Sequence, residues 1–118
     1  MVGRNQSLGA AGESVVAAQY ERLGWTVVDR NWRTRDGEID LIAVSGSTVV
    51  FCEVKTRSSV DFGGGAAAVT HIKQSRIRKV ALAWLAGSSS RWSELRFDVA
   101  VVSAGSHGFA VEVIESAF

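Results

Sequence analysis

The charged residues Asp40, Glu53 and Lys55 lie among apolar residues in the segment GEIDLIAVSGSTVVFCEVK, which also carries Glu38 near its start. Burying an ionised group without a partner is costly, so such residues are usually paired, bound to a metal or placed in a functional cleft. The dipeptide Gly46-Ser47 between the two stretches suits a two-residue type II′ turn, in which Gly comes first. The segment therefore predicts a β-hairpin that carries its charged residues close together.

Counting outward from this turn predicts three cross-strand pairs: Ile42–Phe51, Asp40–Glu53 and Glu38–Lys55. Directly opposite residues share a face of the sheet, with their Cβ atoms ~4.5–5.5 Å apart. Two carboxylates at that distance repel each other unless a cation or a proton lies between them. Their oxygen atoms suit Mg²⁺ or Mn²⁺, and a longer turn would leave Asp40 and Glu53 diagonal but still within reach of one ion.

Lys55 would add a cation on a long stem beside these carboxylates. A divalent ion could polarise a phosphodiester and lower the pKa of a bound water. Lys55 could orient that water or stabilise charge in the transition state, so the three residues suit metal-assisted phosphodiester hydrolysis. The alternative is that Lys55 forms only an ion pair with Glu38 or Glu53 at the sheet edge, which would contribute little.

The order Asp40, then Glu53-Val54-Lys55, resembles the D…ExK signature of restriction-endonuclease-like nucleases, the PD-(D/E)xK superfamily. More specifically, the chain resembles the YraN-type family over nearly its whole length, in the segments RNWRTRDGEIDLIA, VVFCEVKTR, FGGGAAAVTHIKQSRIRKVALAWL and RFDVAVV. It is also similar to archaeal Holliday junction resolvases in the order of an early helical Glu, a strand Asp and ExK. The resemblance implies a nuclease-like fold whose metal is held by Asp40, Glu53 and the main chain at Val54.

The early helical Glu of this pattern corresponds to Glu13, which the resemblance adds to the metal site. Apolar residues follow Glu13 on the same helical row, so its side chain can face the sheet. The alternative is a solvated carboxylate near a helix start, where the helix dipole favours negative charge.

The sequence departs from these patterns at three positions. Ile39 stands where the superfamily name has Pro, which has little bearing on the chemistry. Gly65 and Ala67 replace the Pro and Glu that are usual in YraN-type sequences. The rigidity of that glycine-rich loop, and any role of the acid, are therefore not carried over to this chain.

Basic and amide side chains flank the predicted site and are candidates for binding nucleic acid: Arg33, Arg35, Arg57, Lys73, Gln74 and Arg76. Lys73 lies in an apolar helical row, so it should point inward, either snorkelling over the core or reaching a phosphate at the helix N-terminus. Contacts with phosphates would make binding depend strongly on salt. Trp32, between arginines, could stack on an unpaired base or pack into a turn.

Hydrophobic periodicity predicts the elements that position these residues. The predicted helices are Leu8–Leu23, closed by Gly24, and Val69–Ala86; the predicted strands are WTVVDRNWR, Glu38–Val44, Thr48–Lys55, LRFDVAVVS and FAVEVIES. This order favours an α/β, restriction-endonuclease-like fold with a mixed five-stranded sheet flanked by two main helices. It would form a single domain over residues 1–118. Asp98, in an apolar strand, should pair with an arginine.

Composition limits the classes of protein that fit. The 118 residues are 47% hydrophobic and 21% charged, and the net charge of +1 gives no overall basic field. One cysteine excludes an internal disulfide framework, and no apolar run or leader predicts a membrane span or export, so a cytoplasmic protein is expected.

The function expected from these observations is a Mg²⁺- or Mn²⁺-dependent nuclease. Its partner would be nucleic acid, with DNA favoured over RNA, and a branched or junction structure is one candidate substrate. A homodimer would suit a symmetric junction. Two alternatives remain: a non-catalytic nucleic-acid-binding module that retains a relic site, and a protein-interaction domain.

Overall fold

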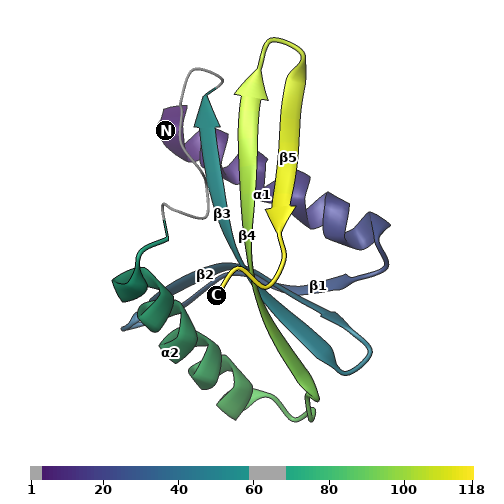
Figure 1. Cartoon of the computed structure of the whole chain (residues 1–118), viewed down its shortest axis with the longest axis vertical. Coiled ribbons are helices and arrows are strands. Elements are labelled where there is room, and N and C mark those ends of the chain that lie inside the picture. Colours follow the sequence, from purple (N-terminus) through teal and green to yellow (C-terminus); the bar gives the residue numbers. More distant parts are fainter. Residues whose placement is uncertain (1–3, 59–68) are drawn as a thin grey trace.

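The computed structural model describes residues 4–58 and 69–118. Its elements are α1 (Arg4–Arg22), β1 (Thr26–Thr34), β2 (Gly37–Ser45), β3 (Thr48–Ser58), α2 (His71–Gly87), β4 (Glu94–Gly105) and β5 (Gly108–Ile114) (Figure 1). They form a five-stranded sheet in the order β1-β2-β3-β4-β5. Only β3 and β4 pair in parallel, joined by the crossover through α2. The predicted mixed sheet with two main helices is confirmed.

The helix ends follow local signals in the sequence. The helix α1 begins at Arg4, earlier than predicted, and is followed by Gly24 with a φ of 95°, the left-handed conformation that a glycine cap permits. The helix α2 follows Thr70, whose hydroxyl accepts the backbone N–H of Lys73 at 3.2 Å. Gly65 and Ala67 of the predicted loop lie outside the described residues. Within those residues, neither helix is both long and apolar enough to cross a membrane.

The central strands bury side chains on both faces of the sheet because a helix covers each face. On one face, Phe51 of β3 packs in a cluster with Ile77 and Val80 of α2. On the other, Cys52 lies in a cluster with Tyr20 of α1. Figure 1 shows α1 crossing behind β3, β4 and β5, while the β1–β2 hairpin runs across the long central strands. This two-sided core fixes β3, which carries Glu53 and Lys55.

Gly12 allows α1 to approach β3 closely. A Cβ atom at Gly12 would lie 2.0 Å from Oγ1 and 3.1 Å from Cβ of Thr56, the residue after Lys55. We expect Gly12→Ala to lower the free energy of unfolding by ~1–3 kcal/mol, because the helix must shift away from the strand. Gly9, one turn earlier with no atom within 4 Å of the added Cβ, is the matched control.

Urea denaturation of both variants measures this difference. In Gly9→Ala the better helix propensity of Ala should raise stability by up to ~1 kcal/mol. Equal effects of the two substitutions would contradict the close approach at Gly12.

Candidate active site

The hairpin register brings the two predicted carboxylates together. The strands β2 and β3 pair from Ser45–Thr48, through Ile42–Phe51, to Leu41–Cys52. Gly46 has a φ of 58°, as the first central residue of the predicted turn requires. Asp40 and Glu53 come next after the last pair, and both line one cavity. The expected register is confirmed as far as Leu41.

The ladder between β2 and β3 ends at Leu41–Cys52. The expected direct pair Asp40–Glu53 is therefore not part of it, although the two carboxylates lie close together, and the expected pair Glu38–Lys55 is wrong. The backbone N–H of Val54 donates to Asp40 Oδ2 at 2.8 Å. A side chain thus accepts the hydrogen bond just beyond the end of the backbone ladder. Glu38 instead lies opposite Arg33 of β1, and Arg33 Nε donates to Glu38 Oε2 at 2.6 Å. The β1–β2 hairpin therefore turns toward α2 and opens a space beside Glu53.

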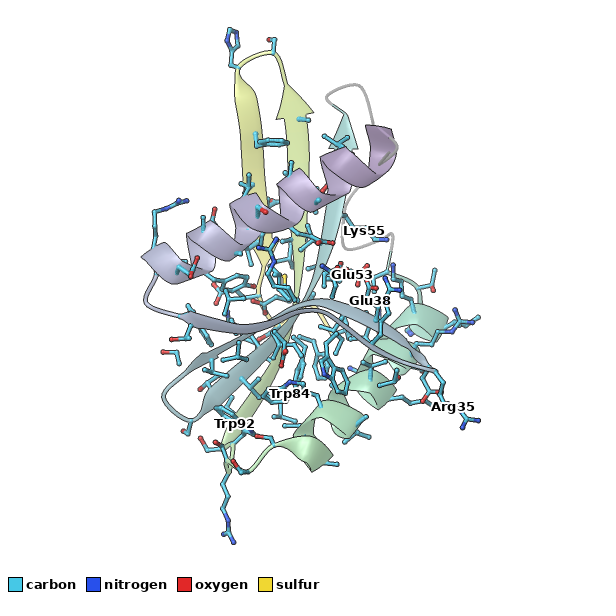
Figure 2. The ribbon with its side chains drawn as sticks, turned by 180° about the vertical axis from the view of Figure 1, so that it is seen from behind. Arg35, Glu38, Glu53, Lys55, Trp84 and Trp92 are labelled. Atoms are coloured by element: carbon cyan, nitrogen blue, oxygen red, sulfur yellow. The ribbon has the colours of Figure 1, made fainter. Side chains whose placement is uncertain are left out.

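Two lysines converge on Glu53 in this space. Lys73 Nζ lies 2.7 Å from Glu53 Oε1, and Lys55 Nζ lies 3.8 Å from the same oxygen. The Glu53 side chain is 9% exposed, whereas the Lys55 and Lys73 side chains are about one-third exposed, at 32% and 37%. Figure 2 shows Glu53 and Lys55 on β3 between the two helices, with Glu38 in the same region and Arg35 farther out on the hairpin. Lys73 points inward, as its helical row predicts.

The cavity beside these residues has a volume of about 540 Å³. It is bounded by the tip of the β1–β2 hairpin, by Asp40 and Glu53, and by the first turns of α2. Its lining residues are Asp36, Gly37, Glu38, Asp40, Glu53, Thr70, Ile72, Lys73, Arg76 and Ile77. Asp36, Thr70 and Ile72 were not singled out from the sequence, although Thr70 carries a helix-start signal, a Thr just before a helical apolar row.

The two carboxylates of the cavity interact with each other and carry donor atoms that suit a cation. Burial, followed by the neighbouring Glu53 carboxylate, raises the pKa of Asp40 to about 7. Oδ2 of Asp40 accepts the backbone N–H of Val54, and the two lysines lie 2.7 Å and 3.8 Å from Oε1 of Glu53. The two carboxylates supply hard oxygen donors, the type that Mg²⁺ and Mn²⁺ prefer. This donor set fits a divalent ion.

Glu13 of α1 lies near the end of β3 that carries Lys55. It lines a neighbouring hollow with Val54, Lys55 and Thr56, and its charge contributes to the raised pKa of Asp40. Among the described residues, no three acidic, histidine or cysteine side chains come close enough to chelate one ion. The structure thus brings Asp40 and Glu53 together and places Glu13 nearby, so a role for Glu13 in holding metal stays a prediction.

A second cavity of about 540 Å³ adjoins the first on the outer side of the hairpin tip. The basic residues that line it are Arg33, Arg35, Arg76 and Lys79. The acidic residues Asp36 and Glu38 line it as well. Arg76 lines both cavities, so a basic surface continues outward from the carboxylates. Lys79 lies three residues after Arg76 on α2, and its place at this cavity depends on the docking of α2 against the hairpin.

The other residues predicted to bind nucleic acid, Gln74, Arg57 and Trp32, make contacts within the protein. The Gln74 amide donates to the carbonyl of Val69 at 3.1 Å, at the start of α2. Arg57 Nε donates to Ser103 Oγ of β4 at 3.4 Å. Trp32 is half-buried and packs against the core cluster that contains Phe51, which favours the packing role that the sequence left open.

The pKa of Asp40 predicts how stability depends on pH. A carboxyl group whose pKa rises from 3.8 to about 7 on folding favours the folded state while it is protonated, and this stabilisation is lost as pH rises from about 4 through 7. We therefore expect Asp40→Asn, in the absence of metal, to raise the free energy of unfolding at pH 8 by on the order of 2–4 kcal/mol, with little gain at pH 4.

Denaturation of the wild type, Asp40→Asn and Asp36→Asn at pH 4, 6 and 8 measures this effect. Asp36 is an exposed carboxylate at the same cavity and serves as the control. A pH-independent difference between Asp40→Asn and the wild type would contradict the burial of an ionised Asp40.

Comparison with known proteins places these residues in a family. Residues 12–102 match the Uncharacterised protein family UPF0102. A UPF0102 protein from Rhodococcus opacus is 49% identical over 107 residues, covering 91% of this chain and 90% of the relative. Another, from Nocardia farcinica, is 44% identical over 118 residues, covering 99% and 93%. The chain therefore belongs to the UPF0102 family, the YraN-type family that its sequence resembles.

Proposed function

We propose that this protein is a metal-dependent nuclease of the PD-(D/E)xK superfamily that hydrolyses phosphodiester bonds in nucleic acid. The observation that carries the proposal is the convergence of two lysines on Glu53, beside Asp40, at the edge of one cavity. Asp40 and Glu53 are each only 8% exposed, yet both line the open space. Charged groups that share a cleft in this way are typical of functional sites rather than of surface ion pairs.

Asp40, Glu53 and Lys55 have distinct roles in this chemistry. Asp40 and Glu53, with the main chain at Val54, would hold Mg²⁺ or Mn²⁺. When bound, the ion would act as a Lewis acid toward the phosphodiester and lower the pKa of a bound water. Lys55, fixed on β3 two residues from Glu53, orients the attacking water or stabilises the developing negative charge.

The basic cavity beside the site suits the phosphate backbone of the substrate. Arg35, Arg76 and Lys79 line it without an ion pair to any acidic side chain of the described residues, whereas Arg33 is held by Glu38. Binding through these cations depends on salt because it releases counterions from the nucleic acid. DNA is the favoured substrate, in particular branched or junction DNA, and cleavage of a symmetric junction would require two copies of the chain.

A second candidate function is a nucleic-acid-binding module without catalysis. The observation that favours it is the ion pair between Glu53 and Lys73, because an ammonium group already compensates the carboxylate without a metal. In such a module the basic cavity would still bind nucleic acid, but the carboxylates would be a structural relic.

Titration calorimetry with Mn²⁺ at pH 8 separates the two functions. The nuclease proposal predicts binding to the wild type that is lost in Asp40→Ala and in Glu53→Ala. Glu38→Ala, which removes a carboxylate of the same cavity that is engaged by Arg33, is the matched control and should retain binding. No heat of binding to the wild type at millimolar Mn²⁺ would favour the binding module.

A further inference from the structure

Lys73 binds a carboxylate that the proposed metal site would use. Its Nζ atom lies 2.7 Å from Glu53 Oε1, the distance of a strong charge-assisted hydrogen bond. Lys55 Nζ is farther from the same oxygen, at 3.8 Å. Glu53 is therefore bound mainly by the lysine that comes from the helix, not by the lysine of its own strand.

The two lysines differ in how firmly they are held. Lys55 lies within β3, where it pairs with Val101 of β4, so its side chain starts from a buried and rigid strand. Lys73 lies in the first turn of α2, where its backbone N–H is capped by Thr70, and its side chain lines the cavity, is 37% exposed and reaches Glu53. A four-carbon stem beside an open cavity can change direction without moving the helix.

The charges in the cavity show why Lys73 would move. The carboxylates of Asp40 and Glu53 are balanced by the ammonium groups of Lys55 and Lys73. A divalent ion held by both carboxylates would give this group a net positive charge, with two ammonium groups a few ångströms from the ion. Repulsion at such distances in a partly buried site is substantial, so one ammonium group must withdraw or gain an anion. The phosphodiester of the substrate is that anion.

We propose that Lys73 is a positioning residue that exchanges partners: it holds Glu53 Oε1 until a divalent ion binds and then contacts a phosphate oxygen of the nucleic acid in the cavity. The proposal rests on the proposed function and adds its regulation. Because Lys73 competes with the ion but binds the substrate, the ion and the nucleic acid strengthen each other's binding. Such coupling is reciprocal, so either ligand can be used to measure it.

Lys73→Met tests the exchange, with Arg76→Met as the matched control. Arg76 is a cation on the same helix that lines the same cavity, and it makes no ion pair with Glu53. Calorimetry without nucleic acid should show that Lys73→Met binds Mn²⁺ about tenfold more tightly than the wild type, and Arg76→Met less than about threefold more tightly. Lys73→Arg, which keeps the cation, should remain close to the wild type.

Fluorescence anisotropy with phosphorothioate-substituted DNA then measures the coupling. Adding Mn²⁺ should raise the affinity of the wild type and of Arg76→Met for this DNA about tenfold, and that of Lys73→Met less than about twofold. Thermal melts of all variants establish that they are folded.

The outcomes separate the exchange from the nuclease itself. Mn²⁺ affinity and coupling that are the same in Lys73→Met and Arg76→Met would overturn the exchange, while Mn²⁺ binding that depends on Asp40 would leave the nuclease standing. No Mn²⁺ binding by the wild type at millimolar concentration would overturn both proposals.

Discussion

If the proposed function holds, Lys55→Met is expected to lower the rate of DNA cleavage by ~10²–10⁴-fold while leaving Mn²⁺ binding in place, because the proposal assigns Lys55 to the water and the transition state rather than to the metal. The Lys55 ammonium lies 3.8 Å from Glu53 Oε1. Burial and the neighbouring Lys73 hold the pKa of Lys55 below its ordinary value. Its proton is therefore easier to remove than that of a solvated lysine, which suits a group that contacts the attacking water.

Single-turnover cleavage with Mn²⁺ at pH 8, beside calorimetry on the same proteins, measures this effect. Lys79→Met is the matched control, since Lys79 lies at the basic cavity and makes no ion pair with Glu53. The control should weaken DNA binding and leave the rate at saturating DNA nearly unchanged. Full activity of Lys55→Met, or an equal loss of Mn²⁺ binding and cleavage, would show that Lys55 has no role in the chemical step.

Asp98→Ala is expected to lower the free energy of unfolding by about 3–5 kcal/mol, because it would leave the buried Tyr20 hydroxyl without its acceptor and the half-buried Arg96 guanidinium with only an exposed carboxylate partner. Asp98 is fully buried and joins three parts of the chain. It accepts hydrogen bonds from Tyr20 Oη of α1 at 2.6 Å, from Arg96 at 2.9 Å twice, and from the backbone N–H of Ser116 at 3.1 Å.

Urea denaturation of Asp98→Ala and Glu115→Ala compares a buried with an exposed partner of the same arginine. Arg96 Nη1 lies 2.8 Å from Glu115 Oε1, but the Glu115 side chain is 65% exposed, so its removal should change stability little. A loss of stability in Asp98→Ala no larger than in Glu115→Ala would contradict the role of Asp98 as the buried junction of α1, β4 and the C-terminal segment.

The sequence predicts the hairpin and its central pair of carboxylates because these features depend on local rules. The turn at Gly46 sets the register, and alternation of side chains then places Asp40 and Glu53 on facing strands. The same count wrongly predicts the pair Glu38–Lys55, because it cannot show where β2 leaves β3. That point depends on the hydrogen bond from the Val54 N–H to Asp40 and on the packing of the hairpin against α2.

Side-chain contacts between elements that are distant in the sequence are also difficult to predict from local rules. The helical row predicts that Lys73 faces inward, but its contact with Glu53 depends on how α2 docks on the sheet. The expected pairing of Asp98 with an arginine is confirmed, and the partner, Arg96, lies two residues earlier on the same face of β4. That partner could have been identified from strand alternation alone, whereas the contribution of Tyr20 required the packing of α1.

A cleavage assay tests the central claim, metal-dependent hydrolysis at Asp40 and Glu53, most directly. Labelled single-stranded, duplex, flap and four-way-junction DNA would be incubated with the wild type and with Glu53→Gln, in Mn²⁺, in Mg²⁺ or in chelator. We predict metal-dependent cutting of at least one of these structures by the wild type, absent in chelator and lost in Glu53→Gln. Cutting that persists in Glu53→Gln, or no cutting of any structure with either ion, would contradict the claim.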